Sequence, residues 1–252
     1  VMTFVDARQD AALQSGHFND FIRIGKIRSA IWNAVKEADE PIGSDRIARL
    51  VFKHLHLSHN DYFRFPNWTG GRAKKVENAM ERYLGTIIYD DLAGNWQVNM
   101  PNLEECALLK INYEYLHDEI TGENGCDRLY DIPELDGLSD ENKERFIIQI
   151  LDYMRHKLCI YSDDRTEEAA KDIEKQVREN LKSPWTLDDN DRITASHALC
   201  FVKPQNKRKA FGKEVAGYRS KLAFFVRDFL NINGGTATIR NSEDYVSYMQ
   251  SL

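Results

Sequence analysis

The order of the predicted elements between residues 22 and 102 constrains the fold of this chain most strongly. Apolar residues recur at helical spacing in three successive segments, and two short β-branched or aromatic runs follow. The helices are predicted at residues 21–38, 44–52 and 72–84, and the strands at residues 86–89 and 95–98. Three helices followed by a β-hairpin are typical of a winged helix, a helix-turn-helix variant with the hairpin as its wing. We therefore expect a winged helix over residues 22–102.

Two strongly amphipathic helices are predicted later in the chain, at residues 139–158 and 166–181. The short acidic loop between them favours antiparallel packing, so residues 103–183 are expected to form a connector and a helical pair. Residues 184–252 are expected to form a second small helical or winged-helix-like module, truncated before its wing. The predicted fold class is mainly α, with a winged helix followed by a helical pair and this second module.

The first residues of the chain have a different pattern. The apolar run Val1–Val5 predicts a short buried strand, and Asp6 is placed to cap the helix that follows. Ligands bind at the carboxyl ends of strands in open α/β sheets, so Asp6, Arg8 and Gln9 form a candidate binding turn. The alternative is structural, with Asp6 as a helix cap and Arg8 paired with a nearby carboxylate. No second strand with a crossover pattern follows, so residues 1–21 are expected to be the edge strand and helix start of a larger domain.

Three stretches of the chain resemble motifs of one helicase family. The run T-F-V-D-A-R-Q-D-A-A-L-Q-S-G-H-F-N-D-F at residues 3–21 resembles the opening of the second RecA-like domain in large superfamily-2 DEAD/DEAH-type helicases. This group is similar to the bacterial mitomycin-repair helicases and to the helicase of the DISARM phage-defence system. The stretches W-Q-V-N-M-P-N-L-E at residues 96–104 and S-P-W at residues 183–185 resemble two further recurring motifs of the group.

The resemblance implies that the chain is an accessory or insert region of an ATP-dependent DNA helicase. Residues 1–21 would then be the edge of a RecA-like motor domain, and Asp6, Arg8 and Gln9 would belong to a motor-domain motif. ATP and Mg²⁺ are the cofactors expected for the parent protein. The expected partners are nucleic acid, DNA in the first place, and the remaining motor domains of the same polypeptide.

The chain itself lacks the sequence motifs for nucleotide hydrolysis. Gly25-Lys26-Ile27 has neither the upstream glycine nor the following Ser or Thr of a phosphate-binding loop. No D-E-x-[HD] run is present to hold magnesium. We therefore expect neither a cofactor nor catalysis in this chain alone.

Two groups of polar side chains are candidates for binding nucleic acid. The polar face of the third predicted helix carries Lys74, Lys75, Asn78 and Arg82. The most basic part of the chain contributes Lys207, Arg208 and Lys209. Lysine and arginine neutralise phosphates, which makes both groups candidate phosphate contacts. The alternative for both is a solvated surface, diluted in the first group by Glu77 and Glu81.

The loop before this third helix is rich in aromatic residues. Its rings belong to Tyr62, Phe63, Phe65 and Trp68. Aromatic rings stack on unpaired bases, but beside a proline they more often fill the core between helices. The sequence leaves both interpretations open.

Composition excludes several other classes of protein. The 252 residues include 34 Lys and Arg against 40 Asp and Glu, a net charge of −6 that excludes a wholly basic nucleic-acid wrapper but not a local basic patch. Four widely separated cysteines predict neither a zinc ribbon nor a disulfide framework and favour the reducing cytoplasm. No apolar run is long enough to span a bilayer, so no membrane partner is expected. His54, His56 and His59 have no cysteine nearby, and no metal site is expected.

A second function is compatible with the same pattern. A non-catalytic winged-helix module would bind another protein or act as a regulator. Contacts with phosphates weaken steeply with salt, whereas a largely apolar protein interface does not. The salt dependence of binding therefore separates the two functions.

Overall fold

The computed structural model describes the backbone of residues 4–93, 101–123, 132–202 and 212–252, and the side chains of these ranges from Phe21 onward. These residues form mainly α-helices with two short strands, so the predicted mainly α class is confirmed. The chain divides into two compact units. Unit 1 consists of Val1–Leu109 and Ser162–Ala195, and unit 2 of Lys110–Tyr161 and Ser196–Leu252.

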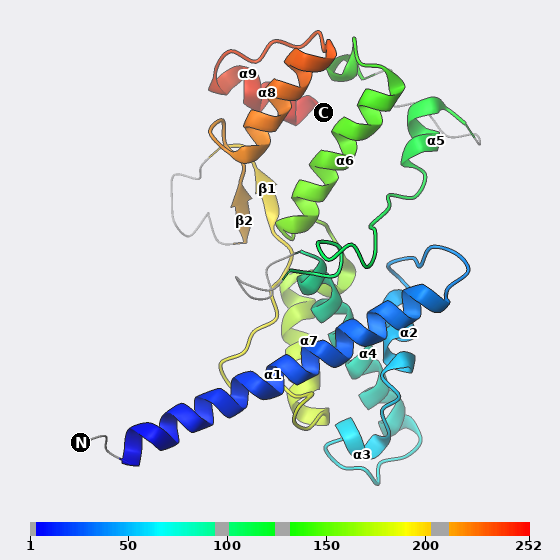
Figure 1. Cartoon of the computed structure of the whole chain (residues 1–252), viewed down its shortest axis with the longest axis vertical. Helices are drawn as coiled ribbons and strands as arrows, with labels where there is room; N and C mark the ends of the chain where they lie inside the picture. Colours follow the sequence, from blue (N-terminus) through cyan, green and yellow to red (C-terminus); the bar gives the residue numbers. More distant parts are fainter. Residues whose placement is uncertain (1–3, 94–100, 124–131, 203–211) are drawn as a thin grey trace. The chain divides into compact units, whose positions relative to one another are not determined.

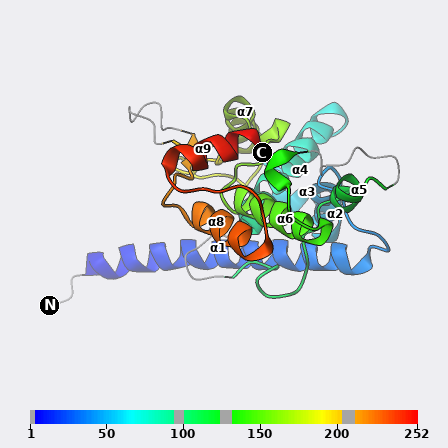
Figure 2. The same ribbon diagram turned by 90° about the horizontal axis from the view of Figure 1, so that it is seen from above.

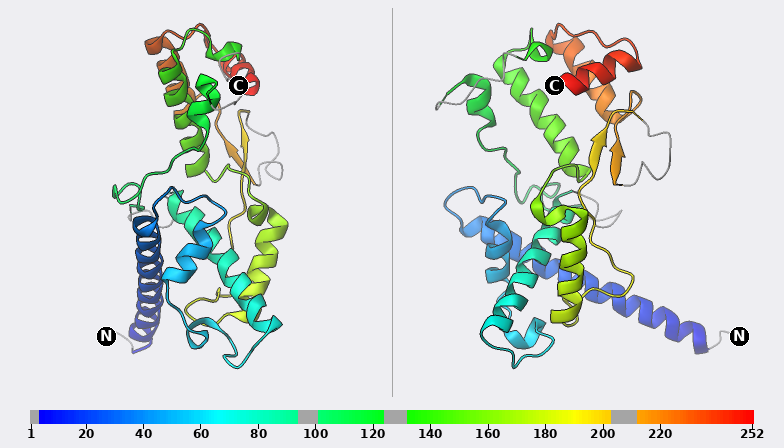
Figure 3. Two further views of the ribbon diagram at one scale, coloured as in Figure 1. Left: turned by 90° about the vertical axis from the view of Figure 1, so that its right-hand side faces the viewer. Right: turned by 180° about the vertical axis from the view of Figure 1, so that it is seen from behind.

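Unit 1 is a helical unit built from two separate chain segments. Its elements are α1 (Phe4–Glu37), α2 (Ile47–His54), α3 (His59–Tyr62), α4 (Gly71–Leu92), the 3-10 turn η3 (Asp163–Arg165) and α7 (Glu167–Asn180). α1 packs on α2, α2 on α4, and α4 on α7, which lies beside it (Figures 1 and 3). The most deeply buried apolar residues include Ile27, Ile31, Val51, Val76, Met80, Leu84, Ile173 and Val177. These helices therefore share one apolar core.

The predicted strand at the start of the chain is wrong where the structure describes it. Phe4 and Val5 belong to α1, which runs as one continuous helix to Glu37 (Figure 2), and residues 1–3 lie outside the described part. A strand needs a neighbour to pair its N–H and C=O groups, whereas a helix pairs them internally. The described residues offer no sheet at this point, and the helical prediction for residues 21–38 is confirmed.

The predicted first strand of the wing, at residues 86–89, is also wrong. These residues belong to α4. Thr86, Ile87 and Ile88 are buried, and the Thr86 hydroxyl donates to the carbonyl oxygen of Tyr83 at 2.8 Å. The helical repeat that buries Met80 and Leu84 continues to Ile88, so packing outweighs the strand preference of β-branched residues. The predicted second strand, at residues 95–98, lies outside the described residues.

The two amphipathic helices predicted as an antiparallel pair belong to the cores of different units. α7 packs on α4 in unit 1, while α6 (Asp140–His156) belongs to unit 2 and packs there on α8 (Lys221–Asn233). The apolar residues that predicted each helix are buried in these separate cores. The division predicted between residues 183 and 184 falls inside the second segment of unit 1.

Unit 2 combines the middle and the end of the chain. Besides α6 and α8 it contains α5 (Leu116–Thr121), the 3-10 turn η2 (Pro133–Leu135), β1 (Ala198–Cys200), β2 (Lys213–Val215) and α9 (Ser242–Ser251). β1 and β2 are parallel, with Leu199 opposite Glu214. The core contains Leu135, Phe146, Val226, Leu230 and Tyr245. Residues 196–252 therefore share their core with the segment from Lys110 to Tyr161 and do not form a separate module.

Candidate nucleic-acid interface

Exposed cations gather at the start of α4 in unit 1. Arg72, Lys74 and Lys75 lie in its first two turns with exposed side chains, and Asn78 is exposed one turn later. Among the residues that the structure describes, no carboxylate forms an ion pair with any of the three cations. Three of the four polar residues predicted on this helix therefore share an accessible face.

Arg82, the fourth predicted residue of this helix, has different contacts. Its guanidinium pairs with Asp164 at 2.9 Å and with Asp172 at 2.8 Å, and only 28 % of the side chain is exposed. The hydrogen bond from Arg82 lowers the pKa of Asp172. These contacts join α4 to η3 and α7, so the geometry favours a structural role for Arg82 over the predicted phosphate contact.

The loop before α4 brings together one exposed and one half-buried aromatic ring. The N–H of Trp68 donates to the carbonyl oxygen of Phe65 at 3.1 Å, which closes a β-turn with Pro66 at its second position. The turn brings the two ring centroids to 5.0 Å with an interplanar angle of 44°. Phe65 is 48 % exposed, while Trp68 is half-buried against the core of unit 1.

Two arginines flank this ring pair. The Cζ atom of Arg64 lies 5.9 Å from the centroid of Phe65, and that of Arg72 lies 5.8 Å from the centroid of Trp68. Both distances are within the range of cation–π attraction. We name the group Arg64, Phe65, Trp68 and Arg72 the ring–arginine cluster. The sequence pattern showed the aromatic residues of this loop but not the two arginines beside them.

Backbone contacts fix this loop to the end of α7. The N–H of Arg64 donates to the carbonyl oxygen of Asn180 at 2.9 Å, and its guanidinium donates to that of Arg178 at 3.1 Å. Phe63 forms an antiparallel bridge with Leu181. The exposed rings are thus held on an ordered loop.

The two alternatives for the aromatic loop apply to different residues. Tyr62 and Phe63 are almost completely buried, so the core interpretation is confirmed for them. Burial raises the pKa of Tyr62 to about 12. Phe65 and Trp68 keep exposed surface, and only these two rings are available for stacking with a partner.

The second basic group lies outside the described residues. Lys207, Arg208 and Lys209 fall between Val202 and Gly212, where the structure gives no placement. Immediately after this segment, unit 2 exposes Lys213, Arg219 and Lys221. The side chains of Asp6, Arg8 and Gln9 are likewise outside the described part, although their backbone belongs to α1.

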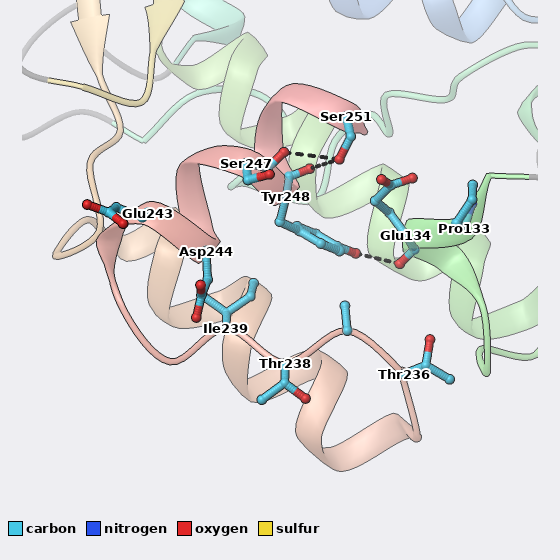
Figure 4. A pocket seen from close by; sticks show the side chains of 11 residues that line it. Pro133, Glu134, Thr236, Thr238, Ile239, Glu243, Asp244, Ser247, Tyr248 and Ser251 are labelled. Atoms are coloured by element: carbon cyan, nitrogen blue, oxygen red, sulfur yellow. Dashed lines mark hydrogen bonds between the residues drawn. The ribbon is translucent and has the colours of Figure 1, made fainter.

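A groove of about 490 Å³ in unit 2 has the opposite electrostatic character (Figure 4). Glu134, Glu243 and Asp244 line it together with hydroxyl groups from residues 236–251. The Tyr248 hydroxyl donates to the carbonyl oxygen of Glu134 at 2.7 Å, and Asp244 accepts from a backbone N–H of Arg240 at 2.9 Å. Carboxylates repel phosphate, so this groove does not suit nucleic acid.

The histidines at the end of α2 and the start of α3 have ordinary protein contacts. His59 stacks on Phe63 with ring centroids 4.1 Å apart and lies 3.5 Å from Glu77, while His54 lies 3.8 Å from Glu37. In the described ranges no group of three or more His, Cys, Asp or Glu side chains is arranged to hold a metal ion. In the same ranges no helix is both long and apolar enough to cross a membrane.

Two stretches that resemble helicase motifs have structural contacts. Asn102 is 1 % exposed and exchanges hydrogen bonds with Glu105, the Asn102 side chain accepting at 2.7 Å and its N–H donating at 3.0 Å. Trp185 is 2 % exposed in the core of unit 1. Comparison of the chain with protein-family models, with curated proteins and with solved structures finds no match.

Proposed function

We propose that this chain binds nucleic acid as the accessory region of an ATP-dependent helicase. One observation carries the binding proposal: Arg64, Arg72, Lys74 and Lys75 are exposed within one loop and the start of one helix, and no described carboxylate pairs with them. Lysine and arginine bind nucleic acid by neutralising its phosphates. A cluster left unpaired is suited to phosphates.

These cations also lie near the N-terminal end of α4, which adds to the positive potential around them. The first N–H groups of a helix have no partner within the helix, and the aligned peptide dipoles make this end positive. α4 has 22 residues, and its first turns carry three of the four cations. Within this proposal the end of α1, α2 and α4 correspond to the three helices of a winged helix, with α4 facing the nucleic acid. Residues 86–89 contribute no wing to it.

The helicase part of the proposal is supported by the sequence resemblance of residues 3–21, 96–104 and 183–185. ATP hydrolysis is assigned to other parts of the polypeptide, with ATP and Mg²⁺ as cofactors there. The coding sequence on both sides of this segment provides the test. A phosphate-binding loop and a D-E-x-[HD] run would support the helicase, and their absence would exclude it.

Binding is tested by fluorescence anisotropy of a labelled forked DNA duplex titrated with the protein. We expect the double variant K74A/K75A to bind about tenfold more weakly at low salt. Each lost phosphate contact lowers the slope of log affinity against log salt by about one. The slope of the double variant should therefore be smaller by about one to two.

A matched control is available on α7 in the same unit. Lys171 and Lys175 are exposed there one turn apart, so K171A/K175A removes the same charge from the same kind of surface. This control should retain the affinity and the salt slope of the unchanged protein. Equal losses in both double variants would show a general charge effect and refute the assigned site. Binding that is insensitive to salt, or no binding, would favour the protein-interaction module.

A further inference from the structure

The ring–arginine cluster indicates which form of nucleic acid the interface binds. We propose that Phe65 and Trp68 form a stacking platform for unpaired bases, so that the interface prefers single strands or the unpaired arms of a fork over duplex. This inference rests on the proposed function and adds its substrate class.

Exposure separates Phe65 from the core aromatic residues that precede it. Phe65 is 48 % exposed, whereas Tyr62 and Phe63 just before it are 2 % and 0 % exposed. A ring that served only the core would be buried like its neighbours. The bases of a single strand offer flat apolar faces of matching size, and stacking on an aromatic side chain buries both surfaces.

Fixation lowers the entropy cost of binding. The β-turn closed between Phe65 and Trp68 sets the spacing of the rings, and Trp68 also packs on the core of unit 1. Arg64 holds the start of the turn through its backbone and side-chain bonds to α7. Because the rings are already placed, little freedom is lost when a base stacks on them.

Charge makes the platform suitable for a nucleic-acid strand. Arg64 and Arg72 lie beside the two rings, and Lys74 and Lys75 follow within the next turn of α4. Bases stacked on the rings would have their phosphates near these cations. Duplex DNA keeps its bases stacked on one another, so only its phosphates are available to the same surface. Both forms bind, but only unpaired bases use the rings.

The experiment compares three labelled ligands: a dT oligonucleotide of about 20 nucleotides, an rU oligonucleotide of the same length and a blunt DNA duplex. We expect F65A and W68A each to bind both single strands about tenfold more weakly and the duplex within twofold of the unchanged protein. The dT and rU ligands show whether DNA or RNA is the better source of unpaired bases. Thermal melts monitored by circular dichroism establish that each variant is folded.

Two further variants sharpen the test. Phe21 on α1 is 55 % exposed in the same unit, so F21A removes an equally exposed ring and should leave all three affinities unchanged. W68F keeps an aromatic ring and should retain single-strand affinity within about threefold. Rescue by W68F distinguishes stacking from a merely structural role of Trp68.

The outcomes separate this inference from the function on which it rests. If F65A and W68A bind single strands as tightly as the unchanged protein, the platform is refuted while salt-dependent binding through Lys74 and Lys75 stands. Equal losses for duplex and single strands would also refute it. If none of the three ligands binds, the proposed function itself fails.

Discussion

At the scale of single residues, Arg165 is the most constrained charge in unit 1. Only 2 % of the residue is exposed, and its guanidinium donates to Asp90 at 2.7 Å and to the carbonyl oxygens of Thr86 and Thr194 at 3.1 and 2.7 Å. Burial raises the pKa of Asp90, and the positive charge of Arg165 opposes that rise. Asp90 keeps 27 % of its side chain exposed, and removing Arg165 would leave this largely desolvated carboxylate without its compensating charge.

We expect R165M to lower the free energy of unfolding by about 3–5 kcal/mol at neutral pH, measured by urea denaturation. Without Arg165 the pKa of Asp90 in the folded protein rises further above its unfolded value. The folded variant then binds the proton more readily than the unfolded chain, so the loss is largest above the raised pKa. The loss should shrink as the pH falls through that pKa.

Two comparisons make this prediction specific to Arg165. R82M breaks two ion pairs whose partners are about half exposed, so it should cost only about 1 kcal/mol. The double variant R165M/D90N removes the buried charge of Arg165 together with its partly exposed partner, and it should recover part of the stability lost in R165M. A loss in R165M that did not depend on pH would contradict the role given to Asp90.

The same scale shows which site residues the sequence could predict. Helical spacing was enough to place Lys74, Lys75 and Asn78 on an accessible face of α4. It also placed Arg82 on that face. Nothing within the helix shows that Arg82 pairs with Asp164 and Asp172, because these partners are more than 80 positions away in the chain. Contacts between residues so far apart in the chain depend on how the elements pack. The spacing of residues along one helix gives no information about that packing.

At the scale of elements, periodicity predicted helices well and their ends poorly. The apolar repeats of α4, α6 and α7 identified each helix, but the β-branched run at residues 86–88 led to a predicted strand. Those residues pack in the core of unit 1, where a helical repeat buries them as well as a strand would. Local preference for a strand is weak compared with burial, so the boundary of α4 was not predictable from its own sequence.

Substitutions at two glycines are expected to change the free energy of unfolding in opposite directions. Gly25 is exposed within α1, and apart from its chain neighbours and the backbone of its own helix no heavy atom lies within 4 Å of the position of an added Cβ, so G25A should stabilise the protein by about 0.5–1 kcal/mol. Gly137 in unit 2 has a φ of +81°, and an added Cβ would collide with the carbonyl oxygen of Gly234. We expect G137A to destabilise by about 1–3 kcal/mol. Urea denaturation of both variants provides the measurement, and a loss of stability in G25A would contradict the helical assignment there.

At the scale of the whole molecule, the connectivity of the two units could not be predicted from the sequence. The chain leaves unit 1 after Leu109, returns to it from Ser162 to Ala195, and then completes unit 2. We predicted that α6 packs on α7 because only a short loop separates the two helices in the sequence. The apolar stripe of a helix shows that it needs a partner but does not identify the partner, and here each helix finds it in a different unit.

This connectivity means that unit 1 depends on its second segment. Ile173, Val177, Leu181 and Trp185 are each 2 % exposed or less, and they complete the core formed with α1, α2 and α4. Large apolar side chains contribute about 1.5–3 kcal/mol each when buried. Losing all four would remove an amount of free energy comparable to the whole stability of a typical domain. A fragment of residues 1–109 should therefore lack a cooperative thermal transition.

Adding a peptide of residues 162–195 to this fragment should restore the transition, measured by circular dichroism melts of the mixture. A matched peptide with I173D and V177D places two carboxylates in the core and should restore nothing. Recovery with both peptides would show that complementation does not use the α7 stripe. A cooperative transition of residues 1–109 alone would show that α1 to α4 are sufficient for a core. The loop of Phe65 and Trp68 is anchored on the end of α7. Restoration by the unchanged peptide alone would therefore show that the proposed interface depends on a helix that follows it by about a hundred residues.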